Sequence, residues 1–219
     1  MFGFARDEDR TEITIVLDRS GSMQSIREET IAGFLAFVDK QKTLPGICRL
    51  TLVQFDTIYE TVYRERPIHK IRSLDLSPRG GTALLDAIGR AIQETADRVE
   101  STWASRRPTR TIVVTITDGQ ENSSREFTRT QVMELVRKYR DEHDWQFVFL
   151  GANQDAIQEA AKYGISSEAA MTYRAGARGT MNAWQALGEA VGRHRQSKSP
   201  RPAGSYFTAD ERNQSQACD

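Results

Sequence analysis

Residues 11–23 read TEITIVLDRSGSM, an apolar segment that ends in an acidic residue and a short turn around a glycine. The apolar part predicts a β-strand over residues 11–18. Its side chains suit a strand covered on both faces, as in a parallel sheet between two layers of helices, because β-branched and apolar residues fill such positions and charges do not. The residues that carry this prediction are Ile13, Ile15, Val16 and Leu17. We therefore expect this strand at the centre of a sheet.

The turn that follows the strand has the composition of a cation site. Asp18, Ser20 and Ser22 occupy alternate positions, and Gly21 allows the backbone to turn sharply so that their oxygens converge. A carboxylate and two hydroxyls are hard oxygen ligands, which suit Mg²⁺ or a similar small divalent cation better than zinc. An Asx or Ser turn that caps the next helix explains the same residues equally well. The metal interpretation needs partners elsewhere in the chain.

Length, charge and cysteine content limit the class of protein. The chain has 219 residues, which suits one α/β domain with an appended segment. Thirty Lys and Arg residues balance thirty Asp and Glu residues, so the charge balance favours neither nucleic acid nor an anionic membrane as a partner. No apolar segment approaches the roughly 18 residues that span a bilayer, and the N-terminus lacks a signal-peptide pattern. With only Cys48 and Cys218 present, we expect a soluble protein of the reducing cytoplasm.

Apolar periodicity outlines the remaining elements. Helices are predicted over residues 25–42, 128–144, 155–163 and 181–194, and a further helix after the turn Gly80-Gly81-Thr82. Strands are predicted over residues 47–55, 58–64, 111–117, 145–150 and 168–173. The link between the first two of these strands is too short for a crossover helix, which indicates an antiparallel hairpin.

The alternation of strands and helices predicts an α/β fold: a doubly wound, Rossmann-like, mostly parallel central sheet with one antiparallel edge strand and helices on both faces. We divide the chain into an N-terminal arm over residues 1–10, a domain over residues 11–195 and a polar C-terminal tail over residues 196–219. The tail is expected to be flexible unless Tyr206 and Phe207 dock against the domain.

Ligands of such sheets bind beyond the carboxyl ends of the strands, where the strand order reverses. Three turns with oxygen-bearing side chains fall in such places: residues 18–22, the turn that contains Thr82, and Asp118 with Gly119. We expect them to form one site. Thr82 also stands where an N-cap would stand, and the capping and ligand roles can coexist.

The segments LDRSGSM, RGGTALLDAI and ITDGQEN together resemble the von Willebrand factor A domains over residues 11–195. In that family a DxSxS motif, a separate Thr and a separate Asp form a metal-ion-dependent adhesion site. The resemblance implies that this cation is Mg²⁺, with Mn²⁺ or Ca²⁺ as alternatives, and that an Asp or Glu carboxylate of a partner protein completes its shell. The metal-site residues it implies are Asp18, Ser20, Ser22, Thr82 and Asp118. The short chain is most similar to single-domain intracellular members from bacteria or phages.

Other polar residues receive ordinary interpretations. Asp86, Glu121 and Asn122 are assigned to the rim of the site or to solvent, outside the metal shell. Asp56 lies in the short turn between the strands predicted over residues 47–55 and 58–64, and an acidic residue is common in such a turn. The histidines have no mutual spacing suited to a metal or a catalytic pair, and all three are expected at the surface or in loops: His69, His143 and His194.

Two other functions are weighed against a protein-binding module. An aspartyl phosphatase or phosphotransferase would carry a second Asp two positions after the first, where this chain has Ser20. A GxSxG elbow and a P-loop are both absent, so we predict that the chain is not an enzyme. The remaining alternative is a scaffold or regulatory partner of an AAA-type ATPase, or of a phage or stress-response system, in which the metal is incidental. The sequence determines neither the partner nor the oligomeric state.

Overall fold

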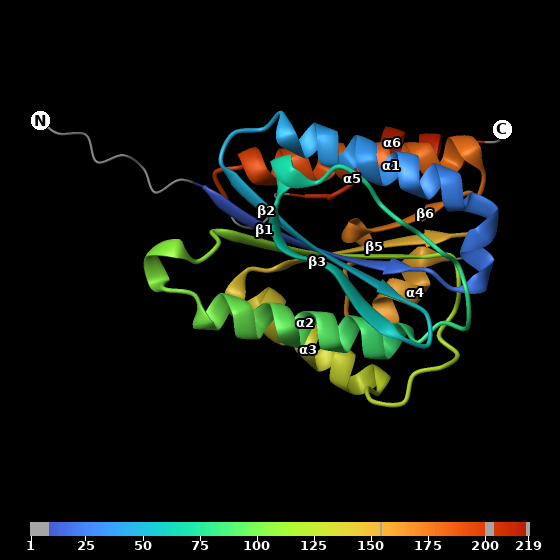
Figure 1. Ribbon diagram of the computed structural model, residues 1–219, viewed down its shortest axis with the longest axis horizontal. Coiled ribbons are helices and arrows are strands. Elements are labelled where there is room, and N and C mark those ends of the chain that lie inside the picture. The colour runs from blue at the N-terminus through green and yellow to red at the C-terminus, as the bar shows by residue number, and fades with distance from the viewer. Residues whose placement is uncertain (1–8, 154, 200–203, 218–219) are drawn as a thin grey trace, which may run out of the picture.

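The computed structural model describes residues 9–153, 155–199 and 204–217, and these form one sheet with helices on both faces (Figure 1). The six strands stand in the order β3-β2-β1-β4-β5-β6. Every neighbouring pair is parallel except β2 and β3, which form the antiparallel edge. The predicted fold class is therefore confirmed. The strand bounds are Arg10–Asp18 (β1), Ile47–Phe55 (β2), Tyr59–Pro67 (β3), Arg110–Thr117 (β4), Gln146–Ala152 (β5) and Ala170–Tyr173 (β6).

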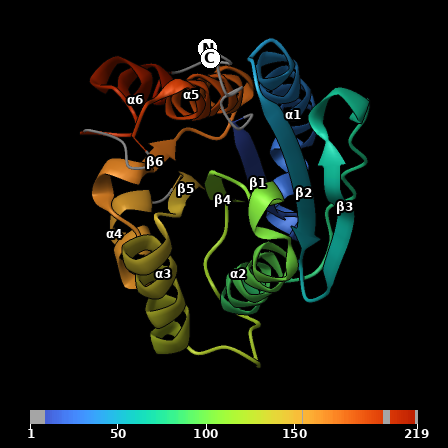
Figure 2. The same ribbon diagram turned by 90° about the vertical axis from the view of Figure 1, so that its left-hand side faces the viewer.

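The helices form two layers, as expected of a doubly wound sheet (Figures 1 and 2). One face is covered by α1 (Arg27–Lys42), α5 (Ala177–Gln196) and α6 (Ala209–Ser215). The other face is covered by α2 (Leu84–Ser101), α3 (Arg129–His143) and α4 (Ala156–Lys162). No helix in the described part of the chain is both long enough and apolar enough to cross a membrane.

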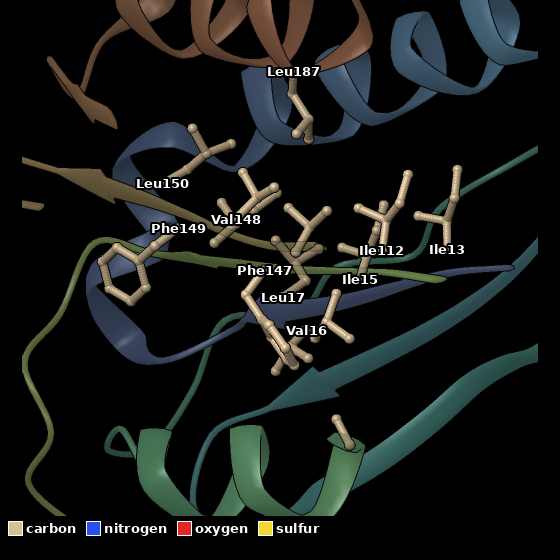
Figure 3. Packing of buried hydrophobic residues seen from close by; sticks show 14 of the residues in the cluster. Ile13, Ile15, Val16, Leu17, Ile112, Phe147, Val148, Phe149, Leu150 and Leu187 are labelled. Carbon is tan, nitrogen blue, oxygen red and sulfur yellow. The ribbon is translucent and has the colours of Figure 1, made fainter. Parts of the chain in front are cut away.

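The central strand β1 is buried over its whole length after Arg10, and its side chains pack against both helix layers. Ile13 pairs in register with Ile112 of β4, and Ile15 pairs with Val114. Figure 3 shows Leu187 of α5 pointing toward Val148 and Leu150 on one side of the sheet. On the other side, the hydroxyl of Thr14 lies 2.9 Å from that of Thr95 in α2. This double coverage explains the unbroken apolar pattern of the strand.

Several predicted boundaries need correction. A 3-10 helix, η1 (Gly21–Ile26), lies between β1 and α1, so α1 begins at Arg27 rather than at residue 25. Thr82 does not cap α2, because the helix begins at Leu84 and its N-cap residue is Ala83, which makes no side-chain cap hydrogen bond. β5 continues through Gly151 and Ala152, beyond the strand predicted over residues 145–150, because these two residues pair with Thr172 and Tyr173 of β6.

The C-terminal segment shows the docking of Tyr206 and Phe207 that is the stated exception to a flexible tail. Tyr206 and Phe207 are buried, and helix α6 follows them with a capping box at Thr208. Burial of two aromatic side chains supplies the apolar contact that the polar composition of this segment conceals. Arg212 of α6 donates hydrogen bonds to carbonyl groups of residues 167, 168 and 170, which fixes α6 beside β6.

His194 was expected at the surface but is buried in α5, with its ring 6.0 Å from that of Tyr206. Burial and the positive charge of Arg110 lower the pKa of His194 to about 4, so the neutral imidazole is the stable form at neutral pH. His69 and His143 are exposed, as predicted.

Candidate metal centre

The candidate site lies at the carboxyl ends of β1 and β4, the two central strands. From β1 the sheet extends through β2 to one edge, and from β4 it extends through β5 to the other. The strand order therefore reverses between β1 and β4, where the loops diverge and leave room for a ligand. Asp18 is the last residue of β1, and Asp118 follows the last residue of β4.

The loop after β1 is held by its own acidic residue. The Asp18 side chain is fully buried, and its Oδ1 accepts a 2.6 Å hydrogen bond from the amide of Ser20. The hydroxyls of Ser20 and Ser22 lie 3.1 Å apart, so both face the same side of the turn. The amide of Gly21 donates to the carbonyl of Gly80 at 3.2 Å and ties this loop to the one that carries Thr82.

Asp118 joins this cluster from β4. The Ser22 hydroxyl donates to Asp118 Oδ1 at 2.7 Å, so the chain from Ser20 through Ser22 to Asp118 is continuous. The next residue, Gly119, faces the remaining donors. A Cβ atom placed on Gly119 would lie 3.0 Å from Thr82 Oγ1, 3.7 Å from Asp18 Oδ2 and 3.8 Å from Ser20 Oγ. Three oxygens from two loops thus surround one small space beside Gly119, which lies in a third loop and leaves that space open because it has no Cβ.

Thr82 is nearly fully buried and is held by its backbone, which leaves its side chain to the site. Its amide donates to Asn122 Oδ1 at 2.9 Å, and its carbonyl accepts from the amide of Asn122 at 3.0 Å. The next amide, that of Ala83, donates to the carbonyl of Asp56 at 3.0 Å. Asn122, which is predicted at the rim, therefore holds the backbone of Thr82 in place.

An ion-pair network centred on the buried side chains of Arg19 and Asp56 supports the first loop. Arg19 Nε lies 2.9 Å from Asp56 Oδ2, and Arg19 Nη1 lies 2.6 Å from Glu60. Arg79 binds the same oxygen of Asp56 at 2.9 Å. Burial alone would raise the pKa of Asp56, but hydrogen bonds from Arg79 and the Ile58 amide, with the charge of Arg19, lower it. Turn chemistry therefore explains only part of the role of Asp56.

Two further acidic residues hold the loop after β4, and the prediction that they are simply solvated is incomplete. Asp86 accepts hydrogen bonds from the amides of Arg125, Glu126 and Phe127. Glu121 accepts one from the amide of Leu85 at 2.9 Å. Both carboxylates therefore fasten the loop of residues 119–128 to the first turn of α2, and neither belongs to the oxygen cluster around Gly119.

The carboxyl groups of the cluster lie in an environment that disfavours their negative charge. Burial raises the pKa of Asp18 to about 6, against hydrogen bonds from Thr117 and Ser20, and Asp118 adds like-charge repulsion. Burial likewise raises the pKa of Asp118. A positive charge among these oxygens would offset both effects.

The donor set fits a hard divalent cation. It offers three hydroxyls and two carboxylates, all oxygen, and Mg²⁺ and Mn²⁺ prefer such ligands. In the described residues no group of three or more His, Cys, Asp or Glu side chains is arranged to hold a metal. The donors at the ends of β1 and β4 are therefore oxygens, as in a hard-cation site, and differ from the sulfur and nitrogen donors of a soft-metal site.

A family model described as the von Willebrand factor type A domain (VWA) matches residues 12–177, well over half of the chain. The chain belongs to this family. The VWA match spans all three loops of the site, from the end of β1 through Thr82 to the loop after β4. No significant match to a curated protein was found.

Solved VWA-like structures share the fold at low sequence identity. The vWF domain of the pilus tip protein Mfa5 from Porphyromonas gingivalis has a TM-score of 0.61 and 11% identity, and the alignment covers 88% of this chain and 98% of that one. Proximal thread matrix protein 1 from the mussel byssus, solved with a zinc-occupied MIDAS motif, has a TM-score of 0.59 and 16% identity. That alignment covers 85% of this chain but only 46% of the mussel protein, so our chain spans about half its length.

A third structure, a von Willebrand factor type A protein from Catenulispora acidiphila, gives a TM-score of 0.53 and 15% identity, with 83% of this chain and 42% of that chain covered. At these identities the comparisons establish the VWA fold, and the roles of individual residues rest on the geometry of this chain.

Proposed function

We propose that this VWA domain binds a divalent cation, Mg²⁺ or alternatively Mn²⁺ or Ca²⁺, at the end of β1 and β4. Ser20, Ser22 and Thr82 would supply hydroxyl ligands, and Asp18 and Asp118 would hold the ion or its waters. The observation that carries the proposal is the convergence of Thr82, Asp18 and Ser20 oxygens around the space beside Gly119. The mussel byssus protein of the same fold was solved with zinc in its MIDAS motif, which supports a metal site in this chain as a proposal.

The role of the ion follows from its ligands. A cation held mainly by neutral hydroxyls keeps most of its charge, and it would attract an Asp or Glu carboxylate of a partner protein to its open position. The protein's own side chains orient the site through the contacts of Ser22 with Asp118 and of Thr82 with Asn122. We therefore propose a metal-dependent protein-binding module. Nucleic acid and membrane are not proposed as partners.

We further propose that the module does not perform turnover chemistry. Ser20 stands where an aspartyl phosphotransferase would carry its acid–base carboxylate, and its hydroxyl is engaged by Ser22. The alternative scaffold, a regulatory partner of an AAA-type ATPase or of a phage or stress-response system, differs in one respect: its binding would not depend on the metal.

The setting of the module is also a proposal. The free thiol of Cys48 is buried in the core and burial raises its pKa to about 11, which suits an inert residue of a reducing compartment such as the cytoplasm. We propose that the chain is similar to the intracellular members found in bacteria and phages. Because α6 packs on α5 and β6, we extend the proposed domain of residues 11–195 to include residues 204–217.

The test separates the metal-dependent module from the scaffold. Isothermal titration with MnCl₂ and MgCl₂ would compare the wild type with Ser22→Ala and with Ser25→Ala. Ser22 is exposed and contacts Asp118, whereas the Ser25 hydroxyl donates only to the carbonyl of Ser22. We expect saturable binding that Ser22→Ala weakens and Ser25→Ala leaves unchanged. Equal binding by wild type and Ser22→Ala would refute the proposed site.

The partner is then sought with the same variants. Affinity capture from lysate in Mg²⁺ is compared with capture in EDTA and with capture by Ser22→Ala in Mg²⁺. A protein that is recovered only with Mg²⁺ and the intact site supports the binding module and identifies its partner. Proteins recovered equally in all three conditions would favour the scaffold alternative.

A further inference from the structure

A second polar cavity lies at the opposite end of the sheet. It has a volume of about 290 Å³ and is bounded by the amino ends of β1 and β2, the end of β3 and the end of α2. In Figure 1 this is the end at which α2 turns back toward β4. Because β1 rises about 3.3 Å per residue from Arg10 to Asp18, the cavity and the candidate metal centre lie about 25 Å apart. The cavity is therefore a separate site.

The charge of the cavity is its main feature. Four arginines line it, and only two acidic residues accompany them, Glu12 and Glu65. The arginines come from four different elements: Arg10 from β1, Arg49 from β2, Arg98 from α2 and Arg106 from the turn before β4. A chain with no net charge thus concentrates a positive excess at one cavity.

Arg98 provides a donor that no protein group satisfies. Its side chain is 12% exposed, and Nη2 donates to Thr95 Oγ1 at 3.0 Å and to Thr51 Oγ1 at 3.3 Å. Glu12 lies 3.7 Å from Nη2. Arg98 Nε, however, is buried without a hydrogen-bond partner in the described part of the chain. A buried guanidinium donor left without an acceptor is costly, and an anion bound beside Arg98 would compensate the charge of this guanidinium.

The wall opposite α2 has an unusual backbone. Glu65 has a φ of 44°, in the left-handed region, where the pairing of β2 and β3 is irregular. Its amide donates to Thr51 Oγ1 at 3.1 Å, and its carbonyl accepts from Arg49 Nη1 at 3.1 Å. This contact orients Arg49 while the other donors of its guanidinium stay available. Non-glycine residues in this conformation are costly and are concentrated at binding sites.

Arg106 completes the cavity from the exposed turn between α2 and β4. Its amide donates to the carbonyl of Trp103 at 2.7 Å, which places both residues in one tight turn. Trp103 is 84% exposed, the most exposed of the large apolar side chains in the described residues. Its indole is therefore a natural optical reporter for events at the mouth of the cavity.

We propose that this cavity binds a small phosphorylated molecule, with phosphate oxygens that accept hydrogen bonds from Arg98, Arg49 and Arg106. Planar guanidinium groups match phosphate in shape and charge, and clusters of arginine are the usual recognition element for it. A volume of about 290 Å³ is at the small end of ligand pockets, which favours a phosphate with a compact organic group over a polymer.

Glu12 supports this assignment from the floor of the cavity. Its carboxyl is buried and accepts from Thr51 Oγ1 at 3.0 Å. Burial raises the pKa of Glu12 to about 7, against the opposing charges of Arg98 and Arg49 and with the like charge of Glu65. A neutral Glu12 would leave the arginine charge uncompensated, so anion binding and protonation of Glu12 favour each other.

The test is titration calorimetry of the full chain with three probes in EDTA, which removes the metal centre from the experiment. The probes are AMP, pyrophosphate and inorganic phosphate. The binding variant is Arg49→Gln/Arg106→Gln, which spares the buried Arg98. The matched control is Arg66→Gln/Arg137→Gln, two exposed arginines outside the cavity. Far-UV circular dichroism of each variant establishes that it is folded.

We expect wild type and control to bind a phosphate probe with equal affinity and the binding variant to bind at least about ten-fold more weakly. Tighter binding of AMP than of the inorganic ions would indicate a phosphorylated organic ligand, and the reverse would indicate free phosphate or pyrophosphate. Equal binding by wild type and binding variant, or no saturable binding of any probe, would overturn the proposal. Citrate and an oligonucleotide are titrated as comparison anions, and tighter binding of either one than of all three phosphate probes would also overturn the proposal. None of these outcomes depends on the proposed metal function.

Discussion

Thr117 donates a 2.5 Å hydrogen bond to Asp18 Oδ2, which ties the last residue of β4 to the buried carboxylate at the end of β1. The same hydroxyl accepts from the amide of Gly119 at 3.1 Å. One threonine thus orients both the acidic residue of the first loop and the glycine that borders the oxygen cluster. The two central strands are therefore joined at the point where the sheet order reverses.

Thr117→Val should destabilise the fold. The substitution keeps the shape of the side chain but removes a donor to a buried carboxylate, and such hydrogen bonds contribute about 2 kcal/mol. Urea unfolding followed by circular dichroism measures the change. Thr30→Val is the matched control, since the Thr30 hydroxyl is buried without a partner in the described part of the chain. The control should be neutral or slightly stabilising, and a similar loss in both variants would contradict the special role of Thr117.

Gly119→Ala should weaken metal binding without removing a ligand. The new methyl group would lie 3.0 Å from Thr82 Oγ1, inside the space that the cation would use. Saturating Mn²⁺ at about 100 times its Kd should stabilise the wild type by about 2.7 kcal/mol, seen as a rise in Tm. We expect most of that rise to disappear in Gly119→Ala.

The control for this experiment is Gly21→Ala. An added Cβ at Gly21 would meet only the Gly80 carbonyl, at an ordinary distance of 3.7 Å, so the Mn²⁺-dependent rise in Tm should be retained. If Gly119→Ala showed the full rise as well, the space beside Gly119 would not be the metal position.

The contrast between predicted and unpredicted contacts has a physical reason. Residues 11–18 and 111–117 were predicted as strands because burial on both faces leaves a local signature in the sequence. The five motif residues were predicted together because each lies at the end of a strand or before a helix, on the side of the sheet where the parallel strands end. The structure brings their loops together there. Whether they hold a metal stays a prediction.

The supporting contacts have no local signature. Thr117 reaches Asp18 across 99 residues, and Asn122 reaches Thr82 across 40. A threonine at the end of a strand or an asparagine in a loop is common, so composition and spacing could not distinguish these two. Composition left the C-terminal segment open for a related reason, because docking depends on two aromatic residues among many polar ones.

Phe207→Ala should test the docking of the C-terminal segment. Phe207 is fully buried and stacks edge-on against Tyr206, with ring centroids 5.4 Å apart. Truncating a buried phenylalanine costs about 3–5 kcal/mol, so the midpoint of urea unfolding should fall markedly. Tyr206→Phe removes a buried hydroxyl without a partner in the described residues and should be neutral or stabilising. An unchanged midpoint in Phe207→Ala would show that this segment adds little to the stability of the domain.

Glu12→Gln should change how stability depends on pH. Burial raises the pKa of Glu12 from 4.5 to about 7, with Arg98, Arg49 and Glu65 as the charged groups that face it. The folded state therefore holds this proton more tightly than the unfolded state, and the resulting stability, full below pH 4.5, is lost as the pH rises through 7. Glutamine stays neutral, so wild type and variant should match near pH 4.5 and the variant should be more stable by roughly 2–3 kcal/mol at pH 8. Urea unfolding at several pH values measures this difference. Glu134→Gln, an exposed change on α3, should follow the wild type throughout, and a parallel course of Glu12→Gln and wild type would show that Glu12 does not titrate in this range.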